Sequence, residues 1–114
     1  MIERIDIANV LFLDVECVSG LPSYEDLSED FKSLWQLKSK QILRQYDEPI
    51  PEKEAAALYP EKAGIYAEFG KIVCISVGIV RRDKDNKLKV RLKSFADDDE
   101  AKLLKDFSEL INQF

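Results

Sequence analysis

KIVCISVGIV, residues 71–80, is the stretch that decides the fold of this chain. β-branched residues dominate it and both of its faces are apolar, which is typical of a strand inside a sheet. The polar run DKDN at residues 83–86 follows, and KLKVRLK at residues 87–93 then alternates charged and apolar side chains. Strict alternation indicates a strand with one face in water. Together with the polar turn, the two runs predict an antiparallel β-hairpin.

Two further elements flank this hairpin. Residues 97–113 carry apolar side chains at helical spacing, which predicts an amphipathic helix packed on the sheet. Asp97, with Glu100 three residues later, resembles a capping box at the start of that helix. Far upstream, NVLFLD at residues 9–14 is a short apolar run that predicts a central strand buried on both faces.

A helical insertion is expected between the first strand and the hairpin, over residues of about 24–62. One helix is predicted over residues 28–45, because Ser28 can act as its N-cap. A shorter helix, residues 52–58, is expected to end before Pro60. The expected order is therefore a strand, the insertion, the hairpin and one helix. This order predicts an α/β fold, and the length of 114 residues predicts one domain or the N-terminal portion of one.

The composition excludes several classes of protein. The charge of the chain is −5, its hydrophobic fraction is 46% and it has no histidine, so it is expected to be globular and to lack a Cys/His zinc site. Cys17 and Cys74 lie in apolar runs, where a free cysteine is commonly a small buried hydrophobe. No stretch is long and apolar enough for a membrane span or a signal peptide, which predicts a cytoplasmic protein without membrane partners.

Residues 81–93 contain seven basic side chains and only two aspartates. We interpret these charges as the solvated face of a strand rather than as a phosphate-binding patch.

Asp14 and Glu16 form the one carboxylate pair that points to chemistry. Side chains alternate along a strand, so residues two apart point to the same face. Carboxylates beside an apolar strand need a partner, and a hard cation such as Mg²⁺ or Mn²⁺ is one that prefers oxygen ligands. The alternative is a pair of acids at a strand end, in water or bonded to lysine. Spacing alone favours that alternative.

Two segments give this pair a wider context. VLFLDVECV, residues 10–18, resembles the first motif of the DEDD superfamily of 3′–5′ exonucleases. AGIYAEFGKIVCISVG, residues 63–78, is similar to the segment that follows in exonucleases related to the proofreading domain of family-B DNA polymerases. The resemblance implies a ribonuclease-H-like fold and a two-metal mechanism acting on single-stranded 3′ ends of nucleic acid. It implies that Asp14 bridges both ions, and that Glu16 ligates one ion and orients the attacking water.

The chain also departs from this family. Cys17 and Ser19 stand where the family usually has threonine and proline. The second and third motifs, with their further carboxylates, have no counterpart, so we expect this chain alone to be inactive or nearly so. The strand that would pair with the first strand is missing as well. An unpaired edge invites association, which predicts a homo-oligomer formed through that edge.

Two other functions compete with the exonuclease. One is a non-catalytic ribonuclease-H-like module for interaction or oligomerisation, which would carry Asp14 and Glu16 without the other ligands. The other is a different enzyme of the same fold, such as a nuclease or transposase core. This different enzyme is the less favoured of the two, because the Asp-x-Glu spacing within one strand suits the exonuclease pattern.

Overall fold

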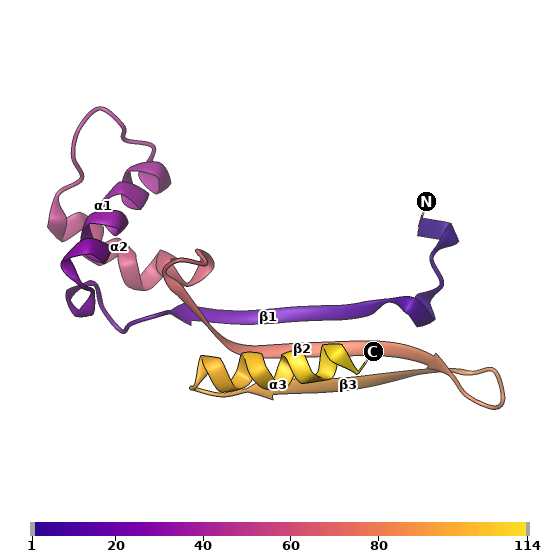
Figure 1. Ribbon diagram of the computed structural model, residues 1–114. Coiled ribbons are helices and arrows are strands. Elements are labelled where there is room, and N and C mark those ends of the chain that lie inside the picture. The colour runs from indigo at the N-terminus through magenta and orange to yellow at the C-terminus, as the bar shows by residue number, and fades with distance from the viewer. Residues whose placement is uncertain (1, 114) are drawn as a thin grey trace. The chain divides into compact units, whose positions relative to one another are not determined.

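In the computed structural model, which describes residues 2–113, the apolar run of the sequence forms the middle strand, β2 (Gly70–Arg82). β1 (Leu11–Ser19) lies on one side of it and β3 (Leu88–Ala96) on the other (Figure 1). Both outer strands run antiparallel to β2. The α/β class and the predicted hairpin are thereby confirmed.

The turn of the hairpin is held by its own polar residues. Asp83 accepts hydrogen bonds through Oδ1 from the backbone amides of Asp85 and Lys87, both at 2.9 Å. Asn86 adopts a left-handed conformation with φ of 62°, which asparagine tolerates better than most residues. The DKDN run therefore closes the hairpin in the way that its composition predicts.

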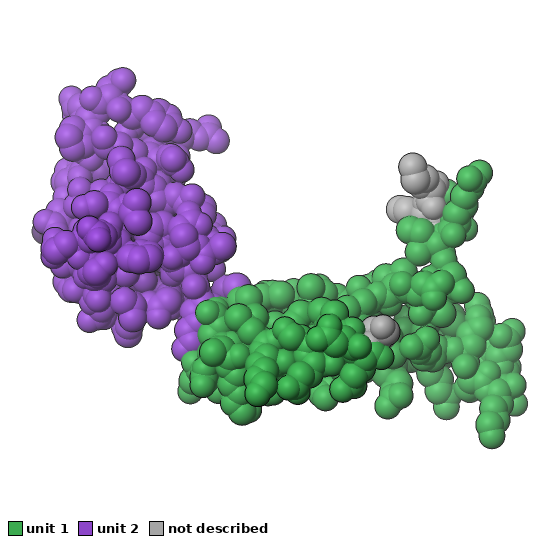
Figure 2. Space-filling model, in the orientation of Figure 1, with its two compact units in different colours: residues 1–16, 72–114 green, residues 17–71 purple. Residues whose placement is uncertain are grey.

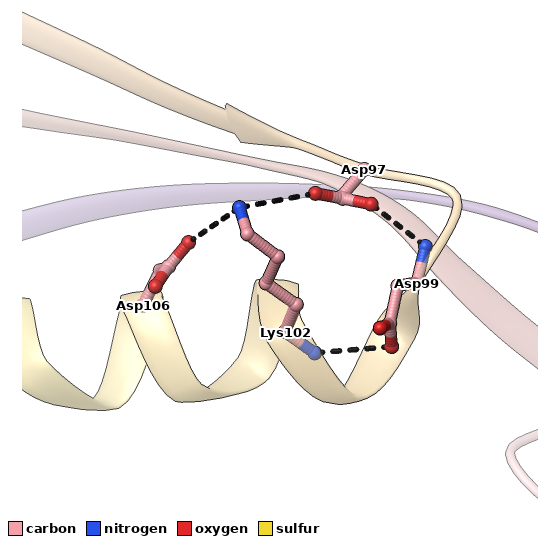
Figure 3. Close-up of polar contacts among 4 residues, drawn as sticks. All are labelled: Asp97, Asp99, Lys102 and Asp106. Carbon is pink, nitrogen blue, oxygen red and sulfur yellow. Dashed lines mark hydrogen bonds and ion pairs between the residues drawn. The ribbon is translucent and has the colours of Figure 1, made fainter.

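α3 (Glu100–Asn112) follows β3, and its start differs from the prediction (Figure 3). The N-cap is Asp99, whose Oδ1 accepts from the amide of Lys102 at 3.2 Å. Asp97 instead accepts from the amide of Asp99 and pairs with the Lys102 ammonium at 3.3 Å. Glu100 reaches the sheet and accepts from the amide of Ile72 at 2.6 Å. The capping box expected from Asp97 and Glu100 is therefore wrong, because both acids bind other groups.

The described chain divides into two compact units (Figure 2). Unit 1 comprises residues 1–16 and 72–114, and unit 2 comprises residues 17–71. In unit 1, Ile75, Val77 and Leu103 form the buried core between the sheet and α3. Partly buried side chains surround them: Leu11, Ile72, Phe95, Phe107 and Leu110.

Unit 2 contains the helical segment expected at about 24–62 and has a core of its own. α1 (Glu29–Leu43) begins at Ser28, whose hydroxyl accepts from the Phe31 amide, so the predicted cap is confirmed. Trp35 is fully buried, and its indole N–H donates to the carbonyl of Ala55 at 2.8 Å.

α2 (Glu52–Lys62) runs through Pro60, so the predicted end before this proline is wrong. Proline in the last turn removes one backbone donor but leaves the earlier turns intact. Short 3₁₀ helices complete the described chain: Ile2–Arg4, Ile7–Asn9, Tyr24–Asp26 and Ala63–Ile65.

The burial of the outer strands departs most from the prediction. β1 was expected to be central and buried on both faces, whereas it lies at an edge and residues 12–18 are exposed. β3 was expected to have one wet face, yet eight of its nine residues are exposed and only Phe95 is partly buried. The reason is the same for both strands. α3 is the only α-helix in the described part of unit 1, and its core centres on β2.

Candidate metal centre

Asp14 and Glu16 project from the face of the sheet that α3 does not cover. Leu11 packs into the core beneath α3, so alternation places Phe12, Asp14 and Glu16 on the opposite face. A methyl group at Gly78 would lie 3.8 Å from the Cβ of Phe12, which supports this orientation. The expectation that both carboxylates share one face is therefore consistent with the packing of their neighbours.

This uncovered face, called here the open face, carries exposed apolar side chains beside polar ones such as Ser76 and Ser94. Besides Phe12 it carries the side chains of β3 that alternate away from α3, namely Leu88, Val90 and Leu92. Phe12 is 49% exposed and Leu92 is 80% exposed. Asp14 and Glu16 are on this face of the edge strand β1, two and four residues after the exposed Phe12.

Neither carboxylate is neutralised by the described chain. Within residues 2–113, Asp14 and Glu16 are exposed and have no ion pair or side-chain hydrogen bond. Of the two alternatives to a metal site, a pair bonded to lysine is not what the structure shows, whereas a pair of acids exposed to water agrees with it. The pair remains available to a cation from solution.

The two carboxylates suit one metal ion that keeps its water ligands better than two ions that have lost them. Two residues of a strand span about 7 Å, so the carboxyl groups can approach one ion only by leaning together. Mg²⁺ commonly keeps several waters and uses one or two carboxylates, which this pair can supply. No group of three or more possible metal-ligating residues occurs among the described residues.

Glu68 and the two cysteines also have side chains that can bind a metal, and they behave differently from the pair. Glu68, in unit 2, forms an ion pair with Lys38 at 2.9 Å, and the hydrogen bond from this lysine lowers the pKa of the Glu68 carboxyl. Cys17 is exposed and Cys74 is partly buried, so the expectation of a buried thiol is wrong for Cys17 and is met only in part by Cys74.

Comparisons of the chain with protein-family models, curated proteins and solved structures give no match. The exonuclease assignment therefore depends on the two quoted segments and on the placement of Asp14 and Glu16. Among the described residues, no helix is long and apolar enough to cross a membrane.

Proposed function

We propose that Asp14 and Glu16 are the first carboxylate pair of a metal-dependent 3′–5′ exonuclease of the ribonuclease-H-like fold. The observation that carries the proposal is this exposed, unpaired pair on one face of β1 at the sheet edge. Three antiparallel strands followed by α3 are the element order that the resemblance implies, which supports the assignment.

The chemistry proposed is hydrolysis of the terminal phosphodiester bond. Bound divalent ions, Mg²⁺ or Mn²⁺, activate a water and stabilise the leaving 3′-oxygen in such reactions. In this chain Asp14 and Glu16 would hold the metal, and Glu16 would also orient the attacking water. The carboxylates contribute position and negative charge rather than covalent chemistry.

The described residues supply only part of that site. Two carboxylates leave half of the charge of two divalent ions unbalanced, and no cluster of three or more possible ligands is present in residues 2–113. The free edge of β1 is where an additional strand would bring carboxylates closest to the pair. We therefore expect the chain alone to bind one ion weakly and to hydrolyse nucleic acid slowly or not at all.

Direct measurement of Mn²⁺ binding tests the proposal. The electron paramagnetic resonance signal of free Mn²⁺ should fall as the wild-type chain is added. Asp14→Asn and Glu16→Gln should each abolish that loss of signal. Glu109→Gln is the matched control, because Glu109 is an exposed carboxylate of α3 in the same unit. Equal Mn²⁺ binding by Asp14→Asn, wild type and the control would refute the proposed site.

A second candidate function, an interaction module, is favoured by a different observation. The open face exposes Phe12, Val90 and Leu92, and β1 has an unpaired edge. Apolar surface next to a free strand edge favours association, here as a homo-oligomer. Light scattering at micromolar concentration should then give a mass above that of one chain, and a clean monomer would exclude this candidate.

A further inference from the structure

Basic side chains of the hairpin gather on the face of the sheet opposite the open face. The register pairs Arg81 with Lys89 and Ile79 with Arg91. Ile79 follows Ile75 and Val77 on the α3 side of β2 by alternation, so Arg81, Lys89 and Arg91 lie on that side too. All three side chains are exposed. We call these three residues the basic face.

We propose that the basic face binds the sugar–phosphate backbone of single-stranded nucleic acid. The choice of nucleic acid as the partner rests on the exonuclease function proposed above. The location of the binding site is argued independently, from the register and the charges of the hairpin. It would hold the strand electrostatically, apart from any chemistry at Asp14 and Glu16.

The register creates a repulsion that a polyanion would relieve. Arg81 and Lys89 are direct cross-strand neighbours, and like charges so placed destabilise a hairpin. Asp83 offsets only part of this repulsion. Its Oδ2 lies 3.8 Å from the Lys89 ammonium, and its Oδ1 accepts the two hydrogen bonds that hold the turn. A phosphate between the two cations would remove the remaining repulsion.

Charge is also separated along the chain. Residues 81–93 carry a charge of +5, so the other residues together carry −10 when the whole chain carries −5. A polyanion would therefore be attracted to the hairpin and repelled elsewhere. The net acidity of the protein does not oppose binding at this one position.

The surface around the basic face is concave as well as positive. Arg91 lines a hollow of about 430 Å³ together with Ile79 and Leu110. Arg81 lines another of about 420 Å³ with Leu11 and Ile111. Each hollow joins a guanidinium to an apolar wall. A sugar can lie against such a wall while its phosphate accepts hydrogen bonds from the arginine.

The acidic side chains of α3 limit where the strand can run. Lys93, further along β3, lines a hollow with Asp106 and Glu109, which would repel phosphate. Asp106 is partly neutralised by its ion pair with Lys102 at 3.4 Å. The favourable path therefore runs towards the turn, over Arg81, Lys89 and Arg91, and not along the helix.

Within residues 2–113, the basic face offers no free aromatic ring. Phe95 lies on the same side but packs edge-to-face against Phe107, with ring centroids 6.2 Å apart. Binding should therefore tolerate any base sequence and depend strongly on salt. With three phosphates neutralised, the affinity for a single strand should fall about 20-fold between about 50 and 200 mM salt.

Fluorescence anisotropy with labelled oligothymidylate, in EDTA, tests the proposal. The triple variant Arg81→Gln, Lys89→Gln, Arg91→Gln should lose at least about tenfold in affinity. Its control carries the same charge change at three exposed lysines of other elements, Lys53→Gln, Lys62→Gln and Lys105→Gln. The control should stay within about twofold of wild type.

Single variants keep the test decisive if the triple variant does not fold. Arg91→Gln should reduce the salt slope by about 0.7, the contribution of one phosphate contact to a single strand, and Arg91→Lys should restore most of it. Equal affinity of the basic-face variants and the lysine control would overturn the proposal. Binding to anionic phospholipid vesicles without binding to oligothymidylate would overturn it too. EDTA removes metal, so this result is independent of the Mn²⁺ measurement on Asp14 and Glu16.

Discussion

Leu103 determines how firmly α3 holds the sheet that presents both β1 and the hairpin. Its side chain is 1% exposed and packs against Ile75 and Val77. Leu103→Ala removes three carbons, which costs about 2.4 kcal/mol at roughly 0.8 kcal/mol per buried carbon. The cavity left behind adds about 1 kcal/mol or more, because the neighbours relax only in part. We therefore expect the free energy of unfolding of unit 1 to fall by about 3–4 kcal/mol.

Hydrogen exchange of the β2 amides is the suitable assay, because the single tryptophan, Trp35, lies in unit 2 and reports on the other core. Leu104→Ala is the matched control: it is the same substitution one position later in α3, at a side chain that is 39% exposed. The control should cost about 1 kcal/mol or less. Equal losses of protection in the two variants would refute the view that burial of Leu103 anchors the helix.

Two further predictions concern other parts of the chain. Gly70→Ala should destabilise the protein, since its new methyl group would lie 2.7 Å from a backbone oxygen, whereas Gly78→Ala meets only the movable end of Leu92 at 2.9 Å. Thermal unfolding of the two variants checks this difference. Lys38→Gln should return the lowered pKa of Glu68 towards its ordinary value of 4.5, because the hydrogen bond from Lys38 is the main cause of the lowering. The stabilisation from this pair is present above pH 4.5 and is lost as pH falls through the lowered pKa, which an NMR titration of Glu68 would follow.

Several features follow from short stretches of sequence alone. The alternation of residues 87–93 and the polar turn before them predict the hairpin, because both depend on neighbouring residues only. Ser28 likewise caps α1 as predicted. The N-cap of α3 could not be predicted from a short stretch in this way, since Asp97 and Asp99 are both suitable N-cap residues. The choice depends on where the chain leaves β3 and on the Lys102 ammonium, which draws Asp97 away.

The candidate site shows the same division. The spacing of Asp14 and Glu16 places them on one face wherever the strand lies, because the pleat has a period of two residues. Whether that strand is buried was not predictable, since the apolar run around the pair fits a central strand as well as an edge strand. The structure places it at the edge, where the carboxylates meet solvent. The basic face also required the register of β2 and β3, which no single stretch contains.

The sequence by itself determined the strands, the hairpin, the helix pattern and the shared direction of the two carboxylates, because these depend on local geometry. Only the tertiary structure decided which face of the sheet is covered. Alternation shows that one face of β3 is charged and the other apolar. Which face becomes buried depends on which one another element packs against. α3 packs over Phe95 on the side that also carries Lys89 and Arg91, and leaves Leu92 exposed on the other side.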